Sequence, residues 1–524
     1  MKKSIVFLLL LVLVIGTGDL FAGSGRDGAS GSGSGPTPIS ISMGGGGRTW
    51  RPDLPNIQEI MRRTNTQLDV VVRPNIDALN LLFASGDLPD IIHFGGMEWQ
   101  QYVSTGYLLP LDDLMRTHGQ NVINTVEPQA WEIVNFQGRT YVLPREGFVN
   151  QSFASVRADW LRNLGIDLSR HQDYGDFGGK VITLDEYRDI LIQFTRNDPD
   201  RNGRHDTYGL GSATQKTNAG WHNIHGAYGG IPGYYYIDNN RVLPYIVTDQ
   251  YRSGLQYINS LWREGVIDPE IYLNTRDQAR QKMINSVSGS LVGEGWSEAY
   301  MLQVDGLQAL VPEADFISIR LTSNDGRIMG TGNPGNLANF TSISTMSRNP
   351  ERVMEFLNYL RTDEGWHLVR VGMEGLDYNM VNGFPIMTES GNNVYNNMIL
   401  DTLWPLVSRI DLISNLARRP VDAWDQLLRQ KWEFLYMDNL PPTYTSVFYG
   451  IPNPDAFNDY NVDVNNWIEQ SSMAFITGET PLTDANWNNY INTWRRMGGV
   501  RILQGFIDNY NNIRGARVTA GITE

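Results

Sequence analysis

The chain has 524 residues, with 14 Trp, 24 Tyr and 18 Phe but no cysteine, and a formal net charge of −15 at pH 7. The lack of cysteine excludes disulfides, thiolate metal sites and a cysteine nucleophile, and the negative charge argues against nucleic acid as a partner. A length well above 300 residues predicts at least two folding units. The aromatic residues exceed what an ordinary core requires, and sugar binding is one use for them, because the C–H face of a pyranose stacks on an aromatic ring.

The first residues have the features of a secretory signal peptide. Lys2 and Lys3 precede an apolar run from Ile5 to Ile15, and small residues lead to a cleavage site after Ala22. A membrane anchor needs about 20 apolar residues, and this run is too short. Residues 23–36 are rich in Gly and Ser and predict a flexible linker. We therefore expect residues 1–22 to direct export and the fold to begin near residue 37.

Strands and helices alternate in the next part of the sequence. Periodicity predicts strands at 38–43, 68–72 and 90–94, with helices at 53–64 and 78–85 between them. This order implies parallel pairing with right-handed crossovers. Ligands bind beyond the carboxyl ends of such strands, so Trp99, just after the third strand, is a candidate ligand contact, with a place in the core as the alternative. Arg145 follows a strand at 139–144 and is a second candidate.

The segment from Thr183 to Leu210 joins a strongly predicted helix to a loop of chemical interest. Thr183 and Glu186 form a capping box, and an apolar face follows at helical spacing, which continues to Phe194. The loop after it reproduces the first nine positions of an EF-hand-type calcium loop, but position twelve, normally a bidentate Glu, is Gly209. An Asp/Asn/Gly-rich surface turn is the alternative. The predicted ligands of a structural Ca²⁺ are Asp198, Asp200, Asn202, the carbonyl of Arg204, Asp206 and Thr207.

Aromatic and glycine residues alternate without a period from Trp221 to Tyr236, so neither a helix nor a regular strand is predicted there. We interpret this stretch as a loop that presents Trp221, His225, Tyr228 and Tyr234 to a ligand, with an aromatic cluster that pins the loop as the alternative. Helices are predicted at 159–165, 253–264, 277–285 and 349–368.

Several segments, in order from about residue 80 to about 510, resemble solute-binding proteins of carbohydrate ABC transporters. They are GDLPDI, RADWLRNLGID, DEYRDILIQFTRNDPDRNGRHDTYGL, SLVGEGWSE, SRNPERVMEFLNYLRTDEGWHLVRVGMEGLDYNM and MAFITGETPLTDANWNNYINTWRRMGGVRILQGFIDNYN. The similarity is to family 1, in the large oligosaccharide-binding branch that includes alginate-binding and lipoprotein-A-type proteins. In those relatives the Asp-rich loop binds structural calcium. An acidic residue often follows its last Asp, and here Thr207 stands in that place.

The resemblance implies an α/β fold of the two-lobed periplasmic-binding-protein type, class II, with a mainly parallel sheet flanked by helices in each lobe and hinge strands between them. Lobe 1 would comprise 37–148 and about 325–395, and lobe 2 would comprise 149–324 and about 396–524. Trp296, Glu374 and Tyr378 would contact the ligand. Arg157 and Asp159 would be structural residues on the hinge side.

The implied function is binding of an oligosaccharide in the periplasm, as a monomer, and delivery to the permease subunits of an ABC transporter. Relatives anchored by lipid use a cysteine that this sequence lacks, so we expect no lipid anchor. We expect no catalysis. The alternatives are a secreted glycoside hydrolase, which needs two suitably spaced carboxylates, and a sugar-sensing protein that signals to a receptor.

Overall fold

A computed structural model describes residues 35–44, 49–126, 128–145, 154–174, 179–211, 221–292, 306–327, 339–381, 384–391, 402–407 and 446–523. The predicted signal peptide lies outside these residues, as does nearly all of the predicted linker. No helix within the described ranges is both long enough and apolar enough to cross a membrane.

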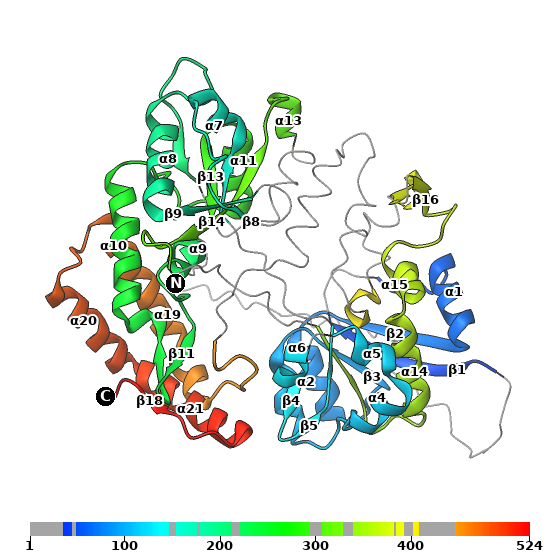
Figure 1. Ribbon diagram of the computed structural model, residues 1–524. Coiled ribbons are helices and arrows are strands. Elements are labelled where there is room, and N and C mark those ends of the chain that lie inside the picture. The colour runs from blue at the N-terminus through cyan, green and yellow to red at the C-terminus, as the bar shows by residue number, and fades with distance from the viewer. Residues whose placement is uncertain are drawn as a thin grey trace, which may run out of the picture. The chain divides into compact units, whose positions relative to one another are not determined.

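The first lobe is built on a five-stranded sheet in the order β2-β1-β3-β15-β6. Figure 1 labels three of its strands, β1, β2 and β3. β1 is parallel to β2 and β3, and β15 is antiparallel to both of its neighbours, so β6 runs in the same direction as β3. The strands are β1 (Thr37–Gly44), β2 (Thr66–Arg73), β3 (Ile91–Phe94), β6 (Leu143–Pro144) and β15 (Phe340–Ile343). The crossover helices are α1 (Pro55–Thr64) and α2 (Ile76–Ser85). The predicted alternation of strands and helices is confirmed.

Further helices complete the first lobe. They are α3 (Gln100–Val103), α4 (Asp112–His118), α5 (Gln120–Asn124), α6 (Pro128–Val134), α14 (Pro350–Leu360) and α15 (Asp363–Arg370). Two small hairpins accompany them, β4 (Asn135–Phe136) with β5 (Arg139–Thr140), and β16 (Tyr378–Val381) with β17 (Phe384–Met387).

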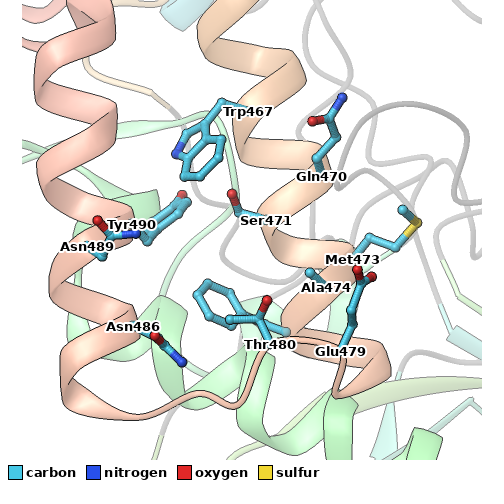
Figure 2. A pocket seen from close by; sticks show the side chains of 11 residues that line it. Trp467, Gln470, Ser471, Met473, Ala474, Glu479, Thr480, Asn486, Asn489 and Tyr490 are labelled. Atoms are coloured by element: carbon cyan, nitrogen blue, oxygen red, sulfur yellow. The ribbon is translucent and has the colours of Figure 1, made fainter.

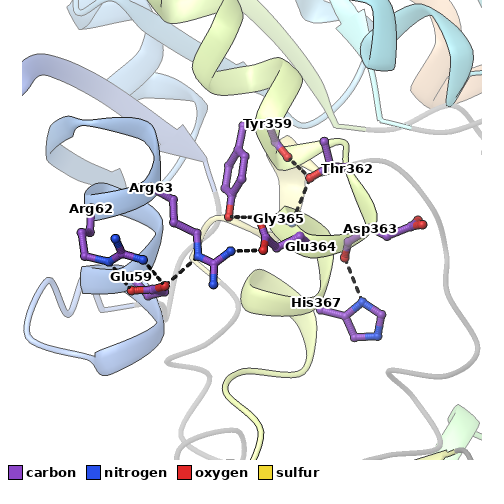
Figure 3. Close-up of polar contacts among 9 residues, drawn as sticks. All are labelled: Glu59, Arg62, Arg63, Tyr359, Thr362, Asp363, Glu364, Gly365 and His367. Carbon is purple, nitrogen blue, oxygen red and sulfur yellow. Dashed lines mark hydrogen bonds and ion pairs between the residues drawn. The ribbon is translucent and has the colours of Figure 1, made fainter.

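The single helix predicted at 349–368 is in fact two helices, α14 and α15. The Thr362 hydroxyl accepts a hydrogen bond from the Gly365 amide at 3.1 Å and so caps a new helix (Figure 3). A Thr side chain that satisfies the backbone in this way favours a helix start over continuation of the preceding helix. On the surface beside this break, Arg63 of α1 forms ion pairs with Glu59 and with Glu364 of α15. Exposed pairs of this kind contribute little to stability.

The second lobe has a six-stranded sheet in the order β10-β13-β7-β14-β9-β8. β10 pairs with β13, and β14 with β9, in parallel, whereas β7 is antiparallel to β13 and β14. β8 is also antiparallel to β9. Most strands of each described sheet run in one direction, but parallel pairs do not outnumber antiparallel pairs in either sheet, so both sheets are mixed where mainly parallel sheets were predicted. The strands are β7 (Ala154–Arg157), β8 (Asp173–Tyr174), β9 (Gly179–Thr183), β10 (Tyr208–Leu210), β13 (Ser288–Val292) and β14 (Phe316–Thr322).

Helices and a small sheet surround this second sheet. The helices are α7 (Ala158–Leu164), α8 (Leu184–Arg196), α9 (His222–Gly226), α10 (Asp249–Arg263), α11 (Arg276–Ile284), α13 (Leu307–Leu310), α19 (Asp455–Thr477), α20 (Asp484–Trp494) and α21 (Val500–Arg514). The small sheet joins β11 (Tyr235–Asp238), β12 (Arg241–Pro244) and β18 (Thr519–Ala520).

Helix α8 shows how the sequence dictates this lobe. The predicted capping box is present, with the Glu186 amide donating to the Thr183 hydroxyl at 3.2 Å and the Glu186 carboxylate accepting from the Thr183 amide at 2.8 Å. The apolar face is buried, from Leu184 to Phe194. Burial of each large apolar side chain is worth about 1.5–3 kcal/mol, which holds α8 against the sheet.

The hydrophobic cores follow the two sheets. One core joins residues 154–321 to residues 448–518. Two other clusters belong to the first sheet, and one of them includes Leu403, Leu406 and Val407. Residues 402–407 therefore pack in the first lobe, and the boundary predicted near residue 395 comes too early. The remaining limits of the lobes stay predictions.

Candidate functional site

Polar side chains gather at the carboxyl ends of the first lobe's parallel strands. β2 ends at Arg73 and β3 carries His93 next to its end. The Arg73 guanidinium donates from Nε to Ser42 Oγ at 2.7 Å and also donates to the His93 carbonyl. Arg73 is 7% exposed, and burial lowers its pKa to about 10. A guanidinium held this firmly is a preorganised group at the edge where open α/β sheets bind ligands.

His93 links this arginine, which bonds its carbonyl, to Asn339 beside the next strand, which bonds its imidazole. His93 Nδ1 accepts from the Gly44 amide at 3.1 Å, so the ring is the tautomer with its proton on Nε2. Nε2 then donates to Asn339 Oδ1 at 3.1 Å. Asn339 lies just before β15 and has a left-handed backbone with a φ of 65°. Its own carbonyl accepts the Arg145 amide at 3.1 Å.

Arg145, a predicted ligand residue, thus lies at the same edge as His93 and Asn339. It follows β6 directly, and β6 runs parallel in direction to β3. Its guanidinium lies over the ring of Trp404, 4.0 Å from the centroid, and Arg370 lies 5.5 Å from the same ring. Trp404 is half-buried. These distances are those of cation–π contacts, which fix the orientation of both side chains.

A buried arginine supports this contact from behind. Arg361 donates to the carbonyls of Pro144, Arg145 and Leu406 at 3.1, 3.3 and 3.1 Å. It ties the end of β6 to the turn that carries Trp404, and burial lowers its pKa to about 9. We define the edge cluster as Arg73, His93, Asn339, Arg145 and Trp404.

Sequence reasoning found Arg145 but missed the other four members of the edge cluster. Arg73 and His93 lie at the ends of predicted strands. Position near the end of a strand is also the reason for the prediction of Trp99 as a ligand contact, so the same rule could have found them. Trp404 stands beside Pro405 in a stretch without a clear period, so only its contacts single it out.

Trp99 lies in the core, which corrects its prediction as a ligand contact. Its ring is 0% exposed and packs against Phe136 and Phe340, with centroid distances of 6.1 and 6.3 Å. The short 3-10 helix Met97–Trp99 bends the chain directly after β3. The side chain is enclosed by the first lobe and cannot stack on a sugar in this structure.

The aromatic stretch after residue 220 is also mainly core. Trp221 is 1% exposed and His225 0%, on a short helix, α9, that the sequence did not predict. The His225 ring stacks on Tyr251 at 4.9 Å and meets Tyr245 edge-on at 5.7 Å. Burial lowers the pKa of His225 to about 3. The alternative of a structural aromatic cluster is therefore correct for Trp221 and His225.

Four other predicted ligand residues have different outcomes. Tyr228 is half-buried, and burial raises its pKa to about 12. Tyr378, 8% exposed, packs in a core of the first lobe, whereas Glu374 is exposed. Trp296 lies outside the described residues. Ligand contact by Tyr228, Glu374 and Trp296 stays a prediction.

The Asp-rich loop folds as a compact turn whose carboxylates converge. Asp198 accepts the amides of Asn202 and Gly203, both at 3.0 Å. The Asn202 side-chain amide donates to Asp200 at 2.9 Å and to Asp206 at 3.2 Å. Desolvation and the nearby charges of Asp198 and Asp206 raise the pKa of Asp200. One side-chain amide therefore bridges two carboxylates of the loop.

One predicted ligand of this loop, Thr207, is wrong, and the structure gives a steric reason for Gly209. The Thr207 hydroxyl donates to the Phe194 carbonyl at 2.7 Å and is buried, so it caps the end of α8 and is not directed at a metal. At Gly209 a Cβ would lie 2.4 Å from the Leu191 carbonyl oxygen, so the close approach of β10 to α8 excludes the Glu of an EF-hand loop. Among the described residues, no group of three His, Asp or Glu side chains is arranged to hold a metal ion.

Arg157 and Asp159, predicted to be structural, form a buried ion pair at the end of β7. The guanidinium donates from Nε at 2.8 Å and from a terminal nitrogen at 2.6 Å to the two carboxylate oxygens. Both side chains are almost fully enclosed. The bidentate geometry satisfies each charge within the protein.

Comparison with known proteins finds related sequences that match most of this chain. Over 472 residues, 87% of this chain and 88% of the relative, the sequence is 22% identical to the polygalacturonan/rhamnogalacturonan-binding protein YtcQ of Bacillus subtilis (strain 168). It is 20% identical to lipoprotein LipO of the same organism, over 86% of this chain and 87% of the relative. The chain is a relative of carbohydrate solute-binding proteins. No protein-family model matches the sequence.

Solved structures of solute-binding proteins share the two-lobed fold. An HMO-binding, ABC-transporter-associated solute-binding protein from Bifidobacterium longum infantis has a TM-score of 0.65 at 15% identity, covering 91% of this chain and 99% of that one. Alginate-binding protein AlgQ2 without calcium ion has a TM-score of 0.57 at 20% identity with the same coverage. An EF-hand mutant of FusA from Streptococcus pneumoniae, with fructo-nystose, scores 0.59 at 15% identity, covering 92% and 100%. The predicted fold is confirmed.

Proposed function

We propose that this protein binds an oligosaccharide and delivers it to the membrane permease of an ABC transporter. The observation that carries the proposal is similarity to a polysaccharide-binding protein over 87% of the chain. The edge cluster adds a physical reason, because it combines a half-buried indole with guanidinium, imidazole and amide groups. Planar polar groups pair with sugar hydroxyls, and an aromatic ring supplies the apolar contact.

The edge cluster also bears on the class of sugar. Arg73 and Arg145 place two guanidinium groups at one edge of the sheet, and Arg370 adds a third beside Trp404. Guanidinium groups bind carboxylates with paired hydrogen bonds. The local positive charge therefore favours an oligosaccharide that contains uronic acid, despite the net charge of −15.

A thermal-shift screen of the mature protein tests the proposal, with oligogalacturonides, alginate oligosaccharides, fructo-oligosaccharides and neutral milk oligosaccharides as probes. Calorimetry on the best probe should then show that Trp404→Ala costs about 2 kcal/mol of binding or more, as for interface hot spots. Trp262→Ala is the matched control, because Trp262 is also half-buried but lies on α10 beside Tyr272. Equal losses in the two variants would remove the edge cluster from the binding site.

Two alternatives make different predictions in the same assays. A glycoside hydrolase would shorten the bound glycan during incubation, and we expect intact glycan. A sugar-sensing protein would bind the same glycan, yet reconstituted permease subunits would not transport it. We propose transport because the relatives that bind sugars include an ABC transporter substrate-binding protein.

We also propose that the Asp198–Asp206 loop binds a structural calcium ion. Asp198, Asp200 and Asp206 would supply carboxylate oxygens, Asn202 an amide oxygen, and Arg204 a backbone carbonyl. Rotation of the Asn202 amide would bring its oxygen to the place now held by its nitrogen. The ion would relieve the repulsion that raises the pKa of Asp200. Its role would be to stiffen the second lobe.

Chelation tests the calcium proposal. Calcium at 100 times its Kd would add about 2.7 kcal/mol to the free energy of unfolding, so a chelator should lower the melting temperature. Asp200→Asn should abolish this response. Asp325→Asn is the control, because Asp325 lies in another exposed turn of the second lobe and pairs with Arg327. A melting curve that chelator leaves unchanged, in protein shown by metal analysis to contain no calcium, would disprove the proposal.

We propose that the protein acts in the periplasm as a monomer. The support for export is the predicted signal peptide at 1–22. Fractionation of the native host and light scattering of the purified protein test the location and the monomer state.

A further inference from the structure

Two opposite charges are neighbours at the carboxyl ends of the first lobe's parallel strands. Arg73 ends β2, and Glu98 lies in the 3-10 helix that directly follows β3. Arg73 donates to the His93 carbonyl, and Glu98 Oε1 accepts the Gly95 amide at 2.8 Å, so both side chains are fixed to the same end of β3. Burial lowers the pKa of Arg73 to about 10, and the nearby charge of Glu98 opposes that effect. Glu98 therefore adjoins the edge cluster.

These two side chains do not form an ion pair with each other. Among the described residues, Arg73 donates only to Ser42 Oγ and to the His93 carbonyl. Its other terminal nitrogen, Nη1, has no partner there and is not enclosed by the protein. Glu98 is half-buried, and its second oxygen, Oε2, has no hydrogen-bond partner in the same part of the chain. One donor and one acceptor are thus left open at an accessible edge of the sheet.

The two open groups match the chemistry of sugar hydroxyls. A guanidinium can only donate hydrogen bonds and an ionised carboxylate can only accept them, whereas a hydroxyl does both. Hydroxyl groups of one sugar residue can therefore accept from Arg73 and donate to Glu98. The carboxylate of a uronic acid would be repelled by Glu98, and the ammonium group of an amino sugar would be repelled by Arg73. A neutral sugar residue suits this position.

The other end of the edge cluster carries a different charge. The guanidinium groups of Arg145 and Arg370 lie 4.0 and 5.5 Å from the centroid of the Trp404 ring, and two such groups suit a carboxylate. We propose that Arg73 and Glu98 form a hydroxyl-binding subsite, so that the ligand is an oligosaccharide in which a neutral residue accompanies a uronic acid. This inference rests on the proposed function, because it divides the same site into two subsites.

Calorimetry on the full mature protein tests the inference with two probes of equal length. One is an oligogalacturonide, in which every residue is acidic, and the other is an oligosaccharide in which rhamnose alternates with galacturonate. The alternating probe should bind about tenfold more tightly, which is the effect of avoiding one like charge near Glu98. A wild type that prefers the oligogalacturonide would overturn the subsite.

Glu98→Gln separates the charge of this side chain from its shape. Gln keeps an oxygen that can accept the Gly95 amide, so the variant should melt like the wild type. The oligogalacturonide should bind about tenfold more tightly to the variant, because the like charge is gone. The alternating probe should bind several-fold more weakly, because a charge-assisted hydrogen bond becomes a neutral one. Two affinities that change in the same direction would indicate a merely structural role and would refute the inference.

Glu479→Gln is the matched control, because it removes the same charge elsewhere. Glu479 is exposed and lines a pocket of about 330 Å³ between α19 and α20 in the second lobe (Figure 2). This variant should keep the wild-type preference between the two probes. A preference that changes in Glu479→Gln and not in Glu98→Gln would move the neutral residue to that pocket and contradict the subsite.

The same titrations separate failure of the subsite from failure of the proposed function. Both probes may bind the wild type while their ratio of affinities is unchanged in Glu98→Gln, and this result would overturn the hydroxyl subsite alone. Absence of binding of any oligosaccharide to the wild type would overturn the proposed function and the subsite together.

Discussion

His225 gives the sharpest test of the distinction between core and ligand contact. Its imidazole is fully buried between Tyr245 and Tyr251, and burial lowers its pKa to about 3. In the unfolded chain a histidine has a pKa of about 6.5. Between these two values the unfolded chain binds a proton that the folded protein does not bind, so stability is present above pH 6.5 and is lost as the pH falls.

The size of this effect follows from linkage. One proton taken up only by the unfolded chain changes the free energy of unfolding by about 1.4 kcal/mol per pH unit. Between pH 6.5, where the unfolded histidine is half protonated, and pH 4.5, His225 alone should therefore cost about 2.3 kcal/mol. His222, whose pKa burial lowers to about 4, should add a similar slope over most of the same range.

The assay is urea unfolding at half-unit steps from pH 4.5 to 6.5 for the wild type and His225→Gln. The variant has a lower stability at every pH, because Gln cannot stack on Tyr251, but its slope should be shallower by about 1.4 kcal/mol per pH unit. His225→Phe, which also has no proton to gain, should show the same slope as His225→Gln. Slopes equal to that of the wild type would refute the buried, neutral imidazole. Oligosaccharide affinity should be unaltered in both variants.

Three further predictions concern the elements that support the site. Asp159→Ala should lower the free energy of unfolding by about 3–5 kcal/mol, measured in urea, because it leaves the charge of Arg157 buried and unpaired; a loss below 1 kcal/mol would show that water reaches the pair. Gly209→Ala should cost at least about 1–3 kcal/mol through the clash with Leu191, and a neutral result would mean that β10 moves freely. Trp99→Ala should cost about 3–5 kcal/mol with unchanged glycan affinity in the folded fraction, and selective loss of affinity would restore Trp99 to the binding site.

The elements of the fold were predictable where the local signals agree. The strands and helices of residues 37–94 have clear periodicity, helix α8 has a capping box as well, and these elements form as predicted. The break between α14 and α15 was missed because apolar residues keep helical spacing across it, while the decisive hydrogen bond of Thr362 is local and polar. At this break the local hydrogen bond of Thr362 outweighs the helical spacing of the apolar residues.

The binding residues were less predictable, because side-chain direction depends on packing that a sequence does not display. Trp99 and Arg145 both follow strands at the same edge of the sheet. The chain turns in a 3-10 helix at Trp99, whose ring is buried, whereas the Arg145 guanidinium is held by the ring of Trp404. Trp404 is distant in sequence from Arg145, so no local pattern links the two. The Asp-rich loop was recognisable because its donors are adjacent in sequence, whereas the steric reason for Gly209 required the packing against Leu191.

Native mass spectrometry of protein expressed in the periplasm is the most direct test of oligosaccharide binding. We predict a protein peak with an adduct whose mass is that of an intact oligosaccharide, released on unfolding and absent in Trp404→Ala but retained in Trp262→Ala. A protein that carries no glycan, and that binds none of the four classes of oligosaccharide in the thermal-shift screen, would contradict the proposed function.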